Sequence, residues 1–437
     1  MENIVYLLTI MSLSMALLVP LHHGQCEAAA RAAATAATSC HHAGTGAAAS
    51  ASASSSAAAC SRSCVGGKAP RKQKQQQPQV EGMFVFGSSL VDSGNNNFLN
   101  GSGVRADYLP YGVDFPLGPS GRFSNGRNVI DALGELLGLP GLVPPFADPR
   151  TRRARARAAL LRGVNFASGG SGILDHTGQG EVVSLRQQIS NFESVTLPDL
   201  RAQLRGPAAA ANHGRIKGQD SFHECYLSKC LFVIGTGGND YLLNYFNPRK
   251  NDGTEGGPPP LSEFTTSLIT KLSDHLQSLY GLGARKFVIF SIQPTGCTPV
   301  VRAFLNITGA ACIEPVNDAV ALFNSELRRL VDGARPPRMP AARFAYIDSY
   351  KIIRDMLDHP AKHGVRETGR ACCKMSRRSS GVLCKKQGPV CRDRTEYVFF
   401  DGLHPTDAVN ARIARKGYGS SSPDHAYPIN VKKLAML

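Results

Sequence analysis

Five short apolar runs recur along the chain, separated by longer stretches whose apolar residues have helical spacing. The runs are Met83–Phe86, Gly163–Phe166, Leu231–Ile234, Phe287–Phe290 and Phe344–Ile347. The longer stretches include Leu185–Val195, Phe264–Tyr280 and Val316–Leu330. The runs are rich in aromatic and β-branched residues and are apolar throughout, as expected of strands buried on both faces. Strands that alternate with helices predict one α/β domain over residues 81–437, with a parallel sheet covered by helices on both sides.

The first 80 residues have a different composition. Asn3–Leu21 carries no charged residue and is followed by Ala-rich sequence, which predicts a secretory signal peptide over residues 1–30. An uncleaved membrane anchor is the alternative, because the stretch approaches the ~20 residues that span a bilayer. Pro20 and the pair His22–His23 interrupt the stretch, so no stable membrane span is expected after cleavage. Residues 31–80 are mostly Ala, Ser, Gly, Lys and Gln and predict a low-complexity disordered linker.

Cysteines and sequons agree with a secreted protein found outside the cell or in the cell wall. From Glu81 onward the cysteines are Cys225, Cys230, Cys297, Cys312, Cys372, Cys373, Cys384 and Cys391. In an oxidising compartment an even set of this kind predicts a disulfide framework, whose connectivity the sequence does not give. Asn100 and Asn306 lie in glycosylation sequons.

The chain is strongly basic, with a formal net charge of +16 at pH 7. Such a charge favours contact with acidic polymers. No nucleic-acid recognition motif accompanies it, so no nucleic-acid partner is predicted. A weak contact with acidic cell-wall polymers is compatible with the charge, although the basic tract at residues 152–157 is more typical of a solvated face.

Small and polar residues follow three of the runs directly. Ligands bind beyond the carboxyl ends of the strands in sheets of this type, so these residues are the candidates for a site. The segments are Gly87-Ser88-Ser89-Leu90, Ala167-Ser168-Gly169-Gly170-Ser171-Gly172 and Gly235-Thr236-Gly237-Gly238-Asn239-Asp240, and a further segment, Asp401-Gly402-Leu403-His404-Pro405, lies near the C-terminus.

These residue types suit nucleophilic catalysis by a serine. A serine hydroxyl needs a base, histidine is tuned for that task near neutral pH, and a carboxylate fixes the imidazole. Asp401 and His404 are three residues apart, so one turn can bring them together. The residues alone leave Ser88 and Ser89 both open as nucleophile.

Each motif also has a simpler interpretation. The Gly-rich segment 169–172 could be a phosphate-binding turn, but it lacks the lysine of a P-loop. Asn239-Asp240 is more often a turn or helix cap. Asp401-x-x-His404 could be half of a metal site, yet no nearby Cys or His completes it. All four segments fall at the carboxyl end of a predicted strand or in the C-terminal loop, and this placement favours a hydrolase.

Several blocks together resemble the plant GDSL-type esterases and lipases of the SGNH hydrolase superfamily. The blocks are "FVFGSSLVDSGNNNF", "GVNFASGGSGIL", "VIGTGGNDYLLNYF", "IQPTGCTP", "FNSELRRLV", the Cys372-Cys373 pair and "YVFFDGLHPTDAVNARIA". The resemblance covers the chain from Glu81 to its end. It implies a three-layer α/β/α sandwich with a five-stranded parallel sheet of flavodoxin-like topology.

The resemblance also implies an activity and a role for individual residues. The activity is hydrolysis of carboxylic esters through an acyl-serine intermediate, with no cofactor and no metal. The expected substrates are lipids, small acyl esters or acylated cell-wall polymers. Ser89, and not Ser88, falls in the nucleophile column, His404 is the base and Asp401 orients it. The oxyanion donors are the Ser89 and Gly170 N–H groups and the Asn239 side chain.

The chain departs from the family pattern at two positions. Ser88 stands where the family usually has the Asp of Gly-Asp-Ser-Leu, and Phe400 stands where it often has Trp. The loss of the aspartate predicts a working but slower enzyme. Two other functions stay open. One is a non-catalytic or weakly active extracellular binding protein, and the other is an acyltransferase that uses the same serine.

Overall fold

The computed structural model describes residues 77–152, 160–210, 219–247, 258–304, 311–333, 338–379 and 381–437. The predicted signal peptide, the predicted linker up to residue 76, the tract 153–157 and the Asn306 sequon lie outside the described residues. Gln79 and Val80, the last residues before the predicted domain boundary, contact the fold. The Gln79 N–H donates to Leu137 O at 3.0 Å, and the Val80 side chain is buried.

A five-stranded sheet forms the centre of the fold. Its strands are β1 (Met83–Gly87), β2 (Leu231–Gly235), β3 (Lys286–Phe290), β4 (Arg343–Ile347) and β5 (Ala426–Pro428), in the spatial order β1-β2-β3-β4-β5. The first four are parallel, and β5 pairs antiparallel with β4. Four of the five predicted strands are therefore confirmed. β5 was not predicted, because its sequence is not one of the apolar runs.

The run Gly163–Phe166 is not a strand of this sheet, and that prediction was wrong. It lies beside β1, where the Val85 N–H donates to Val164 O and the Phe166 N–H to Val85 O. Its other side meets Pro144 and Pro145, which have no N–H to extend a ladder, so only isolated bridges form at Asn165. If this segment is counted as the second strand in chain order, the parallel strands lie in the spatial order 2-1-3-4-5, which is the order of flavodoxin-like sheets.

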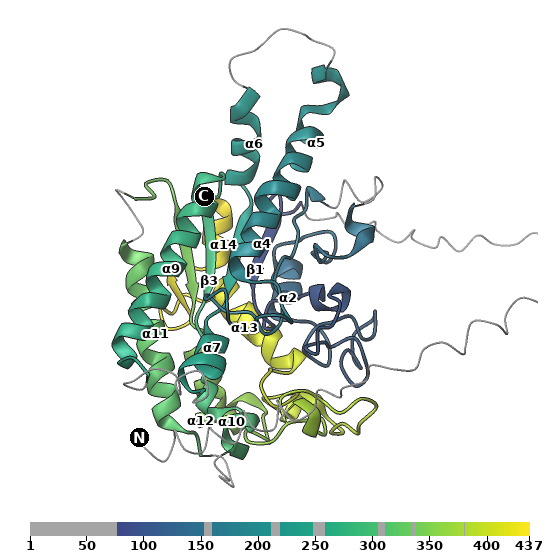
Figure 1. Ribbon diagram of the computed structural model, residues 1–437, viewed down its shortest axis with the longest axis vertical. Coiled ribbons are helices and arrows are strands. Elements are labelled where there is room, and N and C mark those ends of the chain that lie inside the picture. The colour runs from purple at the N-terminus through teal and green to yellow at the C-terminus, as the bar shows by residue number, and fades with distance from the viewer. Residues whose placement is uncertain are drawn as a thin grey trace, which may run out of the picture. The chain divides into compact units, whose positions relative to one another are not determined.

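Two layers of helices cover the sheet (Figure 1). Alternate residues of β1 point to opposite faces: Phe84 and Phe86 join one hydrophobic cluster, and Met83 and Val85 join the other. The first cluster includes side chains of α4 (Leu185–Asn191), α5 (Leu197–Ala210), α6 (Gln219–Ser228), α9 (Leu261–Gly281) and α11 (Glu314–Gly333). The second includes side chains of α2 (Val129–Leu136), α12 (Ser349–Asp358), α13 (Asp407–Gly419) and α14 (Val431–Met436). The predicted three-layer α/β/α fold is confirmed.

The predicted helical stretches are also helical in the structure. α9 and α11 contain the second and third stretches, and a π-helical segment, Phe192–Thr196, extends the first beyond α4. Two short helices, α7 (Gly238–Asp240) and α10 (Pro299–Phe304), follow β2 and β3. Among the described helices, none combines the length and apolar character that a bilayer span requires.

Three disulfides join six of the eight cysteines: Cys297–Cys312, Cys372–Cys391 and Cys373–Cys384. The prediction that all eight form one framework was wrong for Cys225 and Cys230, which are free. Cys225 is exposed on α6, whereas Cys230 is buried directly before β2, so the two side chains lie in different environments.

Candidate active site

A glycine turn carries Ser89 beyond the end of β1. Gly87 has a φ of +132°, and a Cβ atom there would lie 2.1 Å from Gly235 O, so only glycine fits where β1 meets β2. The Ser88 N–H donates to Gly235 O at 2.9 Å, which ends the ladder. The next residue, Ser89, follows this turn and lines a cleft at the carboxyl ends of the strands.

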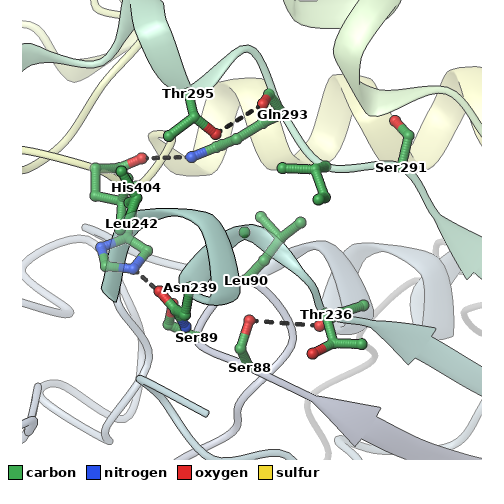
Figure 2. A pocket seen from close by; sticks show the side chains of 14 residues that line it. Ser88, Ser89, Leu90, Thr236, Asn239, Leu242, Ser291, Gln293, Thr295 and His404 are labelled. Carbon is green, nitrogen blue, oxygen red and sulfur yellow. Dashed lines mark hydrogen bonds between the residues drawn. The ribbon is translucent and has the colours of Figure 1, made fainter. Parts of the chain in front are cut away.

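Ser89, His404 and Asp401 form one hydrogen-bonded chain. His404 Nε2 lies 2.8 Å from Ser89 Oγ, and His404 Nδ1 lies 2.8 Å from Asp401 Oδ2. Figure 2 shows the imidazole directed at Ser89, while Ser88 lies apart from it. Both ring nitrogens of His404 are thereby engaged. The arrangement can pass a proton from Ser89 to His404 and stabilise the resulting imidazolium.

Asp401 is fully buried and its carboxylate is held by several donors. Oδ1 accepts the N–H groups of Leu403 at 2.8 Å and His404 at 2.7 Å. Oδ2 accepts the hydroxyl of Tyr111 at 2.6 Å. These donors offset the cost of burying the charge and fix the carboxylate against the imidazole.

Tyr111 is a site residue that sequence reasoning missed. Its side chain is fully buried, and burial together with the charge of Asp401 raises its pKa well above the ordinary value. The hydroxyl therefore stays protonated and donates to Asp401, while it accepts the Cys384 N–H at 3.1 Å. Tyr111 lies 290 residues from Asp401 in the sequence, so no local pattern indicates the pair.

Three predicted oxyanion donors lie on the turns around Ser89. Among the described residues, the N–H groups of Ser89 and Gly170 make no hydrogen bond, which leaves both available. The Gly169 N–H instead donates to Asp92 Oδ2 at 2.9 Å, so Gly170 and not its neighbour carries the available N–H. Asn239 Nδ2 donates to Ser171 O at 2.8 Å, which orients the amide and leaves its second N–H available. Asn239 lines the cleft with Ser89 and His404, whereas Gly170 is not among the lining residues.

Two buried aspartates hold these turns together. Asp92 Oδ1 accepts the N–H of Gly94 at 2.7 Å, in addition to the Gly169 bond at Oδ2. Asp240 accepts the N–H groups of Ile173 and Leu174 and so joins the turn after β2 to the Gly-rich segment. Burial raises the pKa of Asp92 and of Asp240 to about 6 in each case. Asp240 therefore has a structural role, similar to the turn or helix-cap role that the sequence suggested for the Asn239-Asp240 pair.

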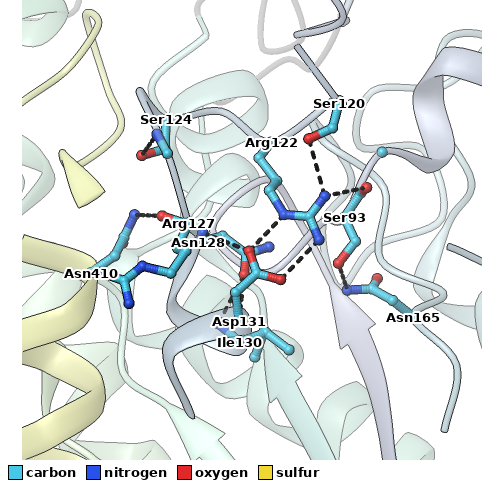
Figure 3. Close-up of polar contacts among 12 residues, drawn as sticks. Ser93, Ser120, Arg122, Ser124, Arg127, Asn128, Ile130, Asp131, Asn165 and Asn410 are labelled. Carbon is cyan, nitrogen blue, oxygen red and sulfur yellow. Dashed lines mark hydrogen bonds and ion pairs between the residues drawn. The ribbon is translucent and has the colours of Figure 1, made fainter. Parts of the chain in front are cut away.

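A polar network supports the backbone that follows Ser89 (Figure 3). Arg122 forms a buried two-point ion pair with Asp131, with N–O distances of 2.6 and 2.8 Å. The third guanidinium nitrogen, Nη1, donates to Ser93 O at 3.2 Å. Asn165 Nδ2 donates to Val91 O at 2.6 Å and to Ser93 Oγ at 2.8 Å. The turn bearing Ser89 is therefore anchored by groups from two other parts of the chain.

The cleft has a mixed lining. Its residues are Ser88, Ser89, Leu90, Gly235, Thr236, Gly238, Asn239, Leu242, Ser291, Ile292, Gln293, Thr295, Leu403 and His404. No group of three or more His, Cys, Asp and Glu residues with the spacing of a metal site occurs in the part of the chain that the structure describes. An ester placed against Ser89 would contact apolar leucine side chains as well as hydroxyl and amide groups.

Comparison with known proteins gives a consistent result. Residues 83–416 match the family model described as GDSL-like Lipase/Acylhydrolase. The GDSL esterase/lipase At1g29670 of Arabidopsis thaliana is 39% identical over 365 residues, which cover 83% of this chain and 93% of the relative. The GDSL esterase/lipase At1g33811 of the same plant is 38% identical over 385 residues, covering 85% of this chain and 95% of the relative.

Proposed function

We propose that this chain, which belongs to the GDSL-like lipase/acylhydrolase family and is an ester hydrolase, is secreted. We further propose that it is a serine esterase with Ser89 as its nucleophile. The observation that carries the proposal is the chain of short hydrogen bonds from Ser89 through His404 to Asp401. This is the arrangement that converts a weak hydroxyl nucleophile into an effective one.

The reaction follows from the positions of these groups. Ser89 Oγ attacks the ester carbonyl carbon while its proton moves to His404 Nε2. The negative charge on the carbonyl oxygen is stabilised by the N–H groups of Ser89 and Gly170 and by the Asn239 amide. His404 then gives the proton to the leaving alcohol, and the acyl-serine remains.

Water completes the cycle. His404 takes a proton from a water molecule as that water attacks the acyl-serine carbonyl, and it returns the proton to Ser89 Oγ when the acid leaves. Throughout, Asp401 keeps its negative charge and stabilises the imidazolium. Tyr111 holds Asp401 in place during both half-reactions.

The proposed setting is the cell exterior, with lipid, small acyl esters or acylated cell-wall polymers as substrates. Three disulfides favour an oxidising compartment, in agreement with the predicted signal peptide. The disulfide-linked segment 372–391 favours weak contact with acidic cell-wall polymers. It carries five exposed basic residues and no acidic one: Lys374, Arg377, Arg378, Lys385 and Lys386.

Two alternatives share the same fold and can be separated by experiment. A binding protein without activity has no need of the Ser89–His404 contact at 2.8 Å, so this contact favours the esterase. An acyltransferase would use every one of the same residues and differ in the acceptor. Adding a series of alcohols during turnover distinguishes it, because transfer yields a new ester where hydrolysis yields the free acid.

The proposal is tested by turnover of p-nitrophenyl acetate with the parent protein, Ser89→Ala and Ser88→Ala. We expect Ser89→Ala to lose at least about 10³-fold in kcat, as removal of a nucleophile does, while Ser88→Ala still turns over. Rapid-mixing measurements should show a burst of p-nitrophenol equal to the enzyme concentration if the acyl-serine accumulates. Undiminished turnover by a folded Ser89→Ala protein would refute the proposal.

A further inference from the structure

The cleft extends past the catalytic pair across the carboxyl ends of β1, β2 and β3. Ser88 follows β1, Thr236 follows β2, and Gln293 lies three residues after β3. Figure 2 shows His404 on one side of Ser89, and Ser88 and Thr236 on the other. Ser88 Oγ lies 3.4 Å from Gly235 O, the residue before Thr236, so the two hydroxyl-bearing residues occupy the same end of the cleft.

Two polar atoms in this lining have no hydrogen-bond partner among the described residues. Thr236 is 8% exposed, and its Oγ1 is buried without a partner. Gln293 Oε1 is also buried without a partner, although Gln293 Nε2 donates to Leu403 O at 2.7 Å and so fixes the amide. Buried polar atoms are normally paired, and those that are not call for a ligand or another specific explanation. Both atoms belong to residues that line the cleft, so a bound group can supply the partners.

Ser88 adds to this polarity. Its contact with Gly235 O is long for an O–H donor, so the hydroxyl is only weakly engaged. The aspartate that usually occupies this position in the family would place a negative charge at the same end of the cleft. With serine, this end of the cleft is polar but uncharged, and the weakly engaged Ser88 hydroxyl is available to a neutral partner.

The reaction geometry assigns this end of the cleft to the acyl part of the ester. His404 must reach the oxygen of the leaving alcohol, so the alcohol lies on the His404 side of Ser89. The acyl part then extends the other way, toward Ser88 and Thr236. An alkyl chain there would leave Thr236 Oγ1 unpaired, whereas a hydroxyl on the chain can both donate and accept.

We propose that Thr236 and Ser88 form a subsite for a hydroxyl group, so that the enzyme prefers esters of hydroxylated acids over those of plain alkanoic acids. The inference rests on the proposed esterase function and names its substrate class. Gln293 contributes a second unpaired acceptor to the same cleft. A site built to hydrogen-bond a substrate hydroxyl discriminates against the analogue that lacks it, because the site's own polar groups are then left unpaired.

The test compares matched 4-methylumbelliferyl esters: butanoate with 3-hydroxybutanoate, and hexanoate with 6-hydroxyhexanoate. The quantity is the ratio of kcat/KM for the hydroxylated ester to that for its plain partner. We expect this ratio to be about five or more for the parent protein with at least one pair, because one neutral hydrogen bond supplies a factor of about that size. Thr236→Val should remove most of this preference, and Ser88→Ala should reduce it.

Thr295→Val is the matched control. Thr295 lines the same cleft, but its hydroxyl already donates to Gln293 O at 3.0 Å, so the same change of side chain removes no free partner. The ratio should therefore stay at the parent value. A parent ratio near one for both pairs, or an equal loss in Thr236→Val and Thr295→Val, would overturn the subsite.

A binding measurement separates failure of the subsite from failure of the esterase. The Ser89→Ala protein is titrated with 3-hydroxybutanoate and butanoate, and with 6-hydroxyhexanoate and hexanoate, by calorimetry. Tighter binding of the hydroxylated acid, lost when Thr236→Val is added, supports the subsite whether or not the parent turns over. Equal binding of both members of each pair contradicts it. Hydrolysis that depends on Ser89 but shows no hydroxyl preference leaves the esterase standing and refutes only the subsite.

Discussion

Removing one hydroxyl, by Tyr111→Phe, should slow the enzyme without removing any group that touches the substrate. Tyr111 donates to Asp401 Oδ2 at 2.6 Å from a fully buried position. A hydrogen bond to a charged group contributes about 1.5–3 kcal/mol. The remaining donors to Asp401 are the two backbone N–H groups and the imidazole itself. Without the phenol, Asp401 Oδ2 keeps the imidazole as its one donor, so the carboxylate is less well fixed against the imidazolium.

The size of the effect follows from how much of that bond acts in the transition state. If about half of it, roughly 0.8–1.5 kcal/mol, supports the imidazolium, then kcat falls about 4- to 12-fold. KM for p-nitrophenyl acetate should change little, because Tyr111 does not line the cleft. The protein should also lose stability, since the Cys384 N–H loses its acceptor.

Tyr108→Phe is the matched control. Tyr108 belongs to the same loop and donates to Cys384 O at 3.0 Å, but it makes no hydrogen bond to Asp401. Its removal should cost stability while kcat stays within about twofold, the range expected when a bond outside the reacting groups is lost. Steady-state kinetics and urea unfolding of both variants provide the assay. A folded Tyr111→Phe protein with the parent kcat, or equal losses of kcat in the two variants, would refute the positioning role.

Three further predictions use the same assays. Asn239→Ala should lower kcat about 100-fold with little change in KM, as loss of one oxyanion donor does, and an unchanged kcat would exclude Asn239 from the oxyanion hole. Removing the Cys373–Cys384 bridge by a double Cys→Ser change should lower the free energy of unfolding by about 3 kcal/mol. It should also lower kcat, because the Cys384 N–H donates to the Tyr111 hydroxyl that holds Asp401. Removal of Cys297–Cys312 should cost stability alone, and equal effects on kcat would contradict the coupling. Burial raises the pKa of Asp92 and Asp240 to about 6, above the unfolded value, so the stability that each contributes is present below about pH 4 and is lost as the pH rises through 6. The loss is on the order of 3 kcal/mol per group, and Asp92→Asn should flatten the pH dependence of urea unfolding between pH 4 and 7.

The sequence predicted the parallel core of the sheet well because its strands are buried on both faces. Val85 and Phe86 point into different helical layers, and both layers demand apolar residues, so the run is easy to identify. β5 was not predicted because it has only three residues and is defined by its pairing with β4. The run at 163–166 has the composition of a strand, but the prolines beside it prevent a continuous ladder.

The candidate site was predictable only in part for a different reason. The residue types left Ser88 and Ser89 open, and only the family blocks favoured Ser89. In the structure it is Ser89 Oγ that meets His404, while Ser88 turns toward Gly235. Tyr111 and Asp92 act through contacts with residues far along the chain, and such contacts leave no periodic or local pattern. Support of this kind becomes visible only once the chain is folded.

The most direct test of the account is covalent labelling by a fluorophosphonate probe, which reacts with an activated serine whatever the natural substrate. Parent protein, Ser89→Ala and Ser88→Ala are labelled in parallel, and the modified peptide is located by mass spectrometry. The account predicts a label on Ser89 in the parent and in Ser88→Ala, and none in Ser89→Ala. A label that persists in Ser89→Ala, or a folded parent that takes no label, would contradict it.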